Sequence, residues 1–132
     1  MTPRIIPFRG IFDERGPLHV CEHGDALPFV VKRFFMLRAE VREVKRGGFA
    51  HLRQSELLVS ILGKTSVRVD GAGGPREFVL VSPNCGLYVP PMTWCEVSIA
   101  RRSELLVLAS DVYDKDDVMR DIPSWEDNRA SA

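Results

Sequence analysis

The stretch RGGFAHLRQSELLVSILG, which runs from Arg46 to Gly63, guides the interpretation of the whole chain. It opens in a basic turn at residues 45–48, where two glycines allow positive φ angles. Phe49 and His51 come next, and in a strand two residues spaced in this way point to the same face. The stretch closes with an apolar run that predicts a second strand. One imidazole on the inner face of a barrel could act as a base or a ligand, because histidine changes its charge near neutral pH.

The composition is that of an ordinary folded protein. The 132 residues fit one domain, residues 1–132, and 45% of them are hydrophobic and 27% charged. Lys and Arg number 18 and Asp and Glu number 18, a balance that gives no support for a nucleic-acid-binding surface. The three cysteines lack Cys-x-x-Cys spacing, which argues against a zinc finger and against a disulfide scaffold.

The sequence shows no pattern typical of a membrane protein. Residues 1–10 hold no apolar segment of signal-peptide length. No apolar run approaches the roughly 20 residues that are needed to span a bilayer. We therefore expect a cytoplasmic protein that does not bind membranes.

Short runs of β-branched and aromatic residues recur along the chain, with glycine or proline turns between them. Beside the opening stretch, the predicted strands are residues 4–13, 18–21, 29–37, 66–69, 77–81, 87–89, 93–99 and 105–109. This spacing predicts an antiparallel barrel or sandwich, with a hairpin across the glycine-rich turn at residues 70–74.

The two ends of the chain carry separate predictions. Helical character is confined to residues 115–125, where Pro123 limits it. The acidic residues 114, 116 and 117 predict a solvated face that closes one mouth of the barrel. Pro7 restricts the first strand to a sheet edge or to a partner subunit's sheet, so we expect a homodimer that exchanges or adjoins its N-terminal strands.

The opening stretch resembles the first motif of the cupin jelly rolls, which is His-x-His, four residues, Glu, six residues and Gly. The chain places Phe49, His51, Glu56 and Gly63 at these positions. The second cupin motif, Pro-x-Gly-x-x-His, is matched at Pro90 and in its spacing, with Cys95 in the last position. The resemblance implies an all-β, cupin-type jelly-roll barrel with a short C-terminal helix. A metal would take His51, Glu56 and Cys95 as ligands, but two of the four ligand positions are altered, so we expect no metal.

A closer resemblance extends over nearly the whole length. The phrases FDERGPL, LPFVVKRFF, RGGFAH, GLYVPPMTWCE and LVLASDVYDKDDVMRD resemble the sugar 3,4-ketoisomerases, cupins that act on dTDP-4-keto-6-deoxyglucose in deoxysugar biosynthesis. The resemblance implies proton transfer through an enediol, with no metal or cofactor. The expected partner is a nucleotide-linked sugar, with dTDP as the expected nucleotide.

The same resemblance implies the residues of the site. His51 matches one of the family's two catalytic histidines and is the predicted base. Arg15 and Arg33 are predicted to hold phosphate oxygens or the sugar, because a guanidinium binds oxyanions in a bidentate manner; Arg33 could instead pair with Glu56 or Glu96. Further predicted substrate contacts are Arg46, Phe49, Glu56, Tyr88, Trp94 and Cys95. For Tyr88 and Trp94, packing is an alternative to stacking on a thymine ring.

The chain also differs from the family pattern. Phe49 replaces the family's other histidine, and a phenyl ring cannot transfer a proton. Cys95 occupies a position that is often His or Arg in the family and is linked to which sugar epimer forms. Two alternatives to an isomerase therefore stay open: a cupin that binds a sugar nucleotide without isomerising it, and a metal-dependent cupin.

Overall fold

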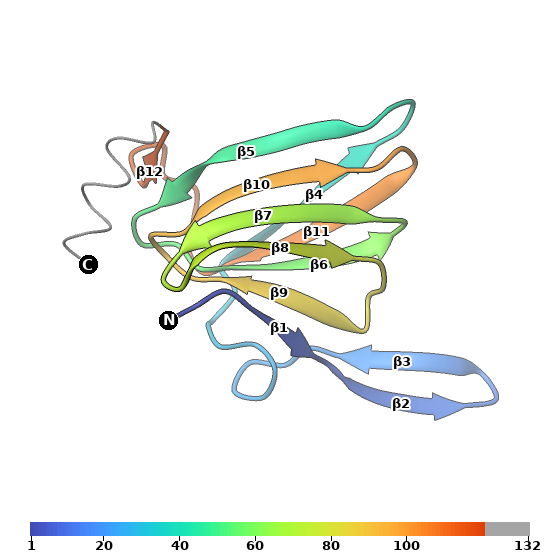
Figure 1. Cartoon of the computed structure of the whole chain (residues 1–132). Coiled ribbons are helices and arrows are strands. Elements are labelled where there is room, and N and C mark those ends of the chain that lie inside the picture. The colour runs from blue at the N-terminus through green and yellow to red at the C-terminus, as the bar shows by residue number, and fades with distance from the viewer. Residues whose placement is uncertain (121–132) are drawn as a thin grey trace.

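The computed structural model describes residues 1–120, and two antiparallel sheets face each other in it (Figure 1). The first sheet has the order β1 (Arg4–Pro7), β9 (Cys85–Val89), β6 (Glu56–Leu62), β11 (Ser103–Ala109) and β4 (Arg33–Ala39). The second has the order β12 (Val118–Met119), β5 (Val44–His51), β10 (Trp94–Ile99), β7 (Thr65–Gly71) and β8 (Gly74–Leu80). This arrangement confirms the all-β, jelly-roll prediction.

The strands β2 (Arg9–Asp13) and β3 (Gly16–Val20) form a separate hairpin. Figure 1 shows this hairpin extending away from the two facing sheets. The predicted hairpin across residues 70–74 is confirmed, because β7 and β8 pair from Thr65↔Leu80 to Gly71↔Gly74. No helix within residues 1–120 is long and apolar enough to cross a membrane.

The main core lies between the two sheets, because alternate residues of each strand point inward. Its most deeply buried members are at most 2% exposed and come from both sheets; they include Leu58, Leu87 and Leu105 from the first and Val67, Val69 and Leu80 from the second. Burying a side chain of this size contributes about 1.5–3 kcal/mol. A second apolar cluster covers the outer face of the first sheet, where Leu57, Val59 and Tyr88 pack against Leu27 and Phe29.

The predicted turn at residues 45–48 is wrong, because these residues lie inside β5. Gly47 and Gly48 have positive φ angles, 90° and 83°, and the pairing with β10 shifts by one residue beside them. Glu96 pairs with Gly47 and Cys95 with Phe49, so Gly48 is the extra residue of a β-bulge. A Cβ atom on Gly47 would lie 2.5 Å from the carbonyl oxygen of Cys95, so the backbone approach requires glycine.

The bulge decides which way Arg46 points. Side chains alternate along a strand, so without an extra residue Arg46 would face away from Phe49 and His51. With Gly48 inserted, Arg46 pairs with Val97 and joins the inner face.

The predicted helix at residues 115–125 is not seen in residues 115–120, and the remainder lies outside the described part of the chain. Residues 114–117 instead form a turn, in which the backbone N–H of Asp117 donates to the carbonyl of Asp114. Strand β12 then pairs with β5, with Val118 opposite His51. This pairing provides backbone hydrogen bonds that a helix would otherwise have supplied within its own segment.

Candidate active site

A cavity of about 210 Å³ lies between the two sheets, and we call it the barrel cavity. Its walls are largely apolar and include Phe35, Leu58, Val97 and Val107. A neighbouring cavity of about 210 Å³, the mouth cavity, is lined by Arg33 and by the loop from Tyr113 to Arg120. The two cavities share the residues Phe35, Phe49, His51, Gln54 and Glu56. The polar members of this shared set therefore stand where the barrel interior meets the loops.

His51 ends β5, and its side chain is 16% exposed. Its Nε2 lies 3.4 Å from Oε2 of Glu56 and 3.3 Å from the side-chain nitrogen of Gln54. Its Nδ1 lies 3.6 Å from Oδ2 of Asp117. The predicted common face of Phe49 and His51 is confirmed: both line the two cavities, and their rings meet edge-on at 5.2 Å.

Gln54 connects the charged residues of the site. It is 2% exposed, and its side-chain nitrogen donates to Oε2 of Glu56 at 2.8 Å. Its side-chain oxygen accepts a hydrogen bond from Nη2 of Arg33 at 3.2 Å. One buried amide thus fixes the relative positions of the histidine, the carboxylate and the guanidinium.

Arg33 begins β4 and points into the mouth cavity. It donates to the carbonyl of Asp111 at 3.1 Å, and its guanidinium lies 5.2 Å from the ring centre of Phe35 and 5.6 Å from that of Tyr113. Within residues 1–120 no salt bridge joins Arg33 to a carboxylate, so the alternative pairing with Glu56 or Glu96 is not observed. The guanidinium is therefore held in place by neutral partners. Because none of them offsets its positive charge, it can bind an anionic ligand.

The other predicted residues that reach the barrel cavity are Arg46, Phe49, Glu56 and Cys95. Burial raises the pKa of the Cys95 thiol, and the nearby Glu56 and Glu96 carboxylates raise it further. Cys95 therefore stays a neutral thiol at neutral pH. Within the described chain, no three His, Cys, Asp or Glu side chains cluster so that they could hold a metal ion, and the metal-dependent alternative gains no support from the geometry.

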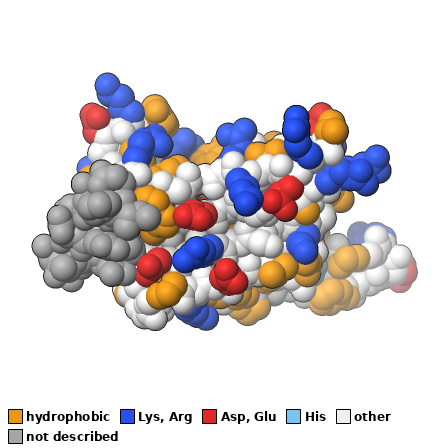
Figure 2. Space-filling model, turned by 45° about the horizontal axis from the view of Figure 1, so that its top comes forward, with side chains coloured by type: hydrophobic (Ala, Val, Ile, Leu, Met, Phe, Trp, Pro, Cys, Tyr) orange, Lys and Arg blue, Asp and Glu red, His pale blue; other side chains and the backbone are white. Residues whose placement is uncertain are grey.

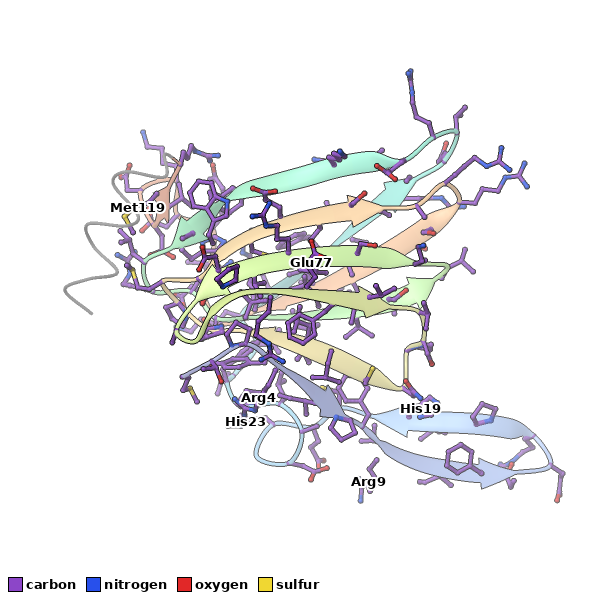
Figure 3. All side chains as sticks on the ribbon, in the orientation of Figure 1. Arg4, Arg9, His19, His23, Glu77 and Met119 are labelled. Atoms are coloured by element: carbon purple, nitrogen blue, oxygen red, sulfur yellow. The ribbon has the colours of Figure 1, made fainter. Side chains whose placement is uncertain are left out.

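Three predicted substrate contacts do not lie in the cavities of their own chain. Tyr88 belongs to the outer apolar cluster, and the guanidinium of Arg4, labelled in Figure 3, lies 5.0 Å from its ring centre. Trp94 points away from the barrel interior and donates to Glu96 at 3.0 Å. Arg15 lies in the β2–β3 turn with its side chain 86% exposed, and it forms a salt bridge of 2.6 Å to Asp13. Their predicted roles stay predictions without support from the site.

Two residues of the site were not predicted from the sequence. Gln54 lies in the turn between β5 and β6, and no local pattern marks it as buried. Asp117 was expected on a solvated acidic face, but it is 3% exposed, while its neighbours Asp114 and Asp116 are exposed. Only the tertiary contacts with residues 51–54 distinguish Asp117 from these neighbours.

A third hollow, of about 450 Å³, lies on the outer face of the second sheet. Its charged residues have mixed signs and include Lys45, Arg68, Glu77 and Glu96. Figure 2 shows the same mixture of basic and acidic side chains over this face. The hollow has no histidine, so the predicted proton transfer is matched by the barrel cavity and not by this hollow.

Comparison with known proteins adds independent information. The model of the family "FdtA: WxcM-like, C-terminal" matches residues 1–130. The chain is 34% identical over 127 residues to the TDP-4-oxo-6-deoxy-alpha-D-glucose-3,4-oxoisomerase of Aneurinibacillus thermoaerophilus, and the match covers 96% of this chain and 91% of the relative.

Solved structures give the same picture. QdtA, a sugar 3,4-ketoisomerase from Thermoanaerobacterium thermosaccharolyticum in complex with TDP, is similar with a TM-score of 0.89 and 28% identity over 98% of this chain and 95% of that one. The dTDP-4-dehydrorhamnose 3,5-epimerase of Bacillus anthracis, at 12% identity, has a TM-score of 0.77 over 89% of this chain and 77% of its own. The second similarity concerns the fold alone.

Proposed function

Because this chain belongs to the FdtA family of WxcM-like, C-terminal domains, we propose that it is a 3,4-ketoisomerase of a TDP-linked 4-keto-6-deoxyhexose. The observation that carries the proposal is the position of His51, which stands between the barrel and mouth cavities with carboxylates near both of its ring nitrogens. The named relatives support the substrate class, since one is an oxoisomerase of this sugar and another binds TDP.

The chemistry requires one base that can reach a carbon-bound proton. His51 takes the proton from C3 of the sugar, and the electron pair of that C–H bond forms a C3–C4 double bond while O4 gains the negative charge. O4 then takes up a proton and O3 loses its own, which moves the negative charge to O3. As the O3 electron pair forms the C3 carbonyl, the pair of the C3–C4 double bond takes a proton from His51 at C4. The Glu56 carboxylate, 3.4 Å from Nε2, stabilises the imidazolium that forms between the two steps.

The charged residues around His51 fit a sugar nucleotide. Arg33 faces the mouth cavity with a fixed guanidinium, which suits phosphate oxygens or the developing charge on O4. Arg46 lines the barrel cavity at a separate point, where the bulge in β5 has turned it inward. We assign both residues to substrate binding.

The proposal is tested by incubating the protein with TDP-4-keto-6-deoxyglucose and following the sugar carbons by NMR. We expect the C4 carbonyl signal to decline as a C3 carbonyl signal appears. Binding of the sugar nucleotide in calorimetry, without any new carbonyl signal, would contradict the proposal and indicate a binder that does not isomerise its ligand.

We also propose that the protein is a homodimer, because its N-terminal hairpin exposes apolar side chains. Ile11, Phe12 and Leu18 are 52%, 72% and 54% exposed, and an isolated two-stranded hairpin is marginally stable in water. A second copy would cover these residues and could bring Arg15 near the cavity of the other chain. Sedimentation velocity should give twice the chain mass for the parent and the chain mass for Phe12→Asp. A monomeric parent would contradict the proposal.

The cytoplasmic location stays a prediction.

A further inference from the structure

The carboxylate of Asp117 is buried beside the imidazole of His51. One of its oxygens accepts the backbone N–H of Arg53 at 2.8 Å, and the other accepts that of Gln54 at 3.1 Å. The guanidinium of Arg53 also lies 3.6 Å from Oδ1. These donors hold the carboxylate in one orientation, with Oδ2 directed at Nδ1 of His51 at 3.6 Å.

The surroundings of Nδ1 favour a hydrogen on this atom. Nδ1 is buried and has no hydrogen-bond partner in residues 1–120, whereas buried polar atoms nearly always have one. Oδ2 of Asp117 acts as a hydrogen-bond acceptor, as its bond from the Gln54 N–H shows. An acceptor oxygen repels a lone pair on the nearby Nδ1 and attracts an N–H group. Hydrogen bonds of catalytic groups are often long and tighten when substrate binds, which allows this contact to close.

The surroundings of Nε2 favour the absence of a hydrogen there. Gln54 uses its side-chain oxygen to accept from Arg33 and its side-chain nitrogen to donate to Glu56, which fixes the orientation of the amide. The same nitrogen faces Nε2 of His51 at 3.3 Å. Oε2 of Glu56 also lies 3.4 Å from Nε2, but no hydrogen bond joins these two atoms. The amide N–H of Gln54 that is directed at Nε2 pairs with a lone pair there, so it selects the same tautomer as Asp117 does.

We propose that Asp117 is a positioning residue, which keeps the proton of neutral His51 on Nδ1 and leaves Nε2 as the proton acceptor. Its catalytic consequence rests on the proposed function, while the tautomer itself does not. The network joins three separate segments: residues 51–56, residues 114–117 and the start of β4.

The tautomer can be measured without substrate, by two-bond ¹H–¹⁵N NMR on the labelled full chain near neutral pH. His51→Asn identifies the His51 signals among those of His19 and His23, which Figure 3 places on the N-terminal segments. We expect Nδ1 to show the shift of a protonated nitrogen and Nε2 that of an unprotonated one. The opposite assignment would overturn the proposal.

Asp117→Asn tests the role of the carboxylate, because an amide can also donate to Nδ1. We expect a mixed or reversed tautomer and a kcat lower by roughly 100-fold, with KM changed by less than about threefold. Asp116→Asn is the matched control: it removes the same charge from an exposed neighbour and should keep the tautomer and kcat of the parent. A parent-like tautomer and kcat in Asp117→Asn would overturn the proposal.

The outcomes separate this inference from the proposed function. A parent with the expected tautomer but no isomerase activity would contradict the proposed function and leave the positioning of the ring standing. An active parent whose tautomer is reversed would support the proposed function and overturn the positioning role of Asp117. If Asp117→Asn does not fold, as circular dichroism would show, the tautomer of the parent decides the question alone.

Discussion

The barrel cavity and its mouth differ in how the chain builds them. The apolar wall consists of alternate residues on regular strands, such as Leu58 on β6 and Val97 on β10. The polar mouth consists of residues at a strand end, in a turn and in a loop: His51, Gln54 and Asp117. The wall thus follows from strand periodicity, whereas the mouth depends on contacts between segments that are far apart in the sequence.

The largest expected effect comes from a substitution in the polar mouth that leaves the apolar wall intact. His51→Asn removes the proposed base, so we expect kcat to fall by 1,000-fold or more, equivalent to about 4 kcal/mol of transition-state stabilisation. The free energy of unfolding should change little, because the side chain is at the edge of the apolar core. Product formation and urea unfolding measure the two quantities. A variant with parental kcat would exclude His51 as the base.

The converse substitution alters the apolar wall and leaves the residues of the polar mouth intact. Leu58→Ala removes a side chain that is 2% exposed, and we expect the free energy of unfolding to fall by about 2–4 kcal/mol. The polar contacts of His51 are with Gln54, Glu56 and Asp117, so we expect kcat to stay within about tenfold of the parent at temperatures where the variant is folded. Urea denaturation followed by fluorescence gives the first value and the isomerase assay the second. A stable variant that has lost activity would show that the wall and the mouth are not separate.

Phe49→His extends the polar mouth by one inward-facing residue into the apolar wall of the barrel cavity. The phenyl ring meets His51 edge-on at 5.2 Å, so an imidazole in its place would supply a second proton-transfer group near the first. We expect kcat to rise by about tenfold, at a cost of about 1 kcal/mol in stability for the buried polar atoms. Phe49→Leu is the control without a proton-transfer group and should not raise kcat. Equal rates in the two variants would show that the second group is not limiting.

The smallest effect concerns Cys95, which lies on the wall but carries an ionisable group. Because burial and neighbouring carboxylates raise the pKa of its thiol, Cys95 is protonated in both the native and unfolded states below about pH 8. As pH rises through the ordinary thiol pKa, only the unfolded state loses this proton, so stability should decline there and not at neutral pH. Iodoacetamide should modify Cys95 more slowly in the native protein than in urea at pH 8. Equal rates would contradict its enclosure.

The regions that sequence reasoning predicted are those governed by local periodicity. The common face of Phe49 and His51 and the hairpin from Thr65 to Leu80 follow from alternation and from a glycine-rich turn. The bulge at Gly48 could not be predicted, because paired glycines with positive φ fit a turn as well as a bulge. The register against Cys95 and Glu96 in β10 decides between the two.

The same limit explains the residues that were missed. Asp117 lies in an acidic run in which charge and spacing are nearly uniform, and only its backbone partners in the 51–54 turn bury it. The predicted helix failed there for the same reason, since pairing with β5 overrides local preference. Strand patterns therefore placed His51 on the inner face, whereas the residues that surround it could be identified only from the fold.

The most direct test of the central claim is the exchange of sugar protons with solvent. The parent protein and His51→Asn are incubated with TDP-4-keto-6-deoxyglucose in D₂O, and deuterium is measured by NMR at C3 of recovered substrate and at C4 of product. If His51 removes the C3 proton, the parent incorporates deuterium at these carbons and the variant does not. Equal incorporation by both proteins, or none by the parent, would contradict the claim.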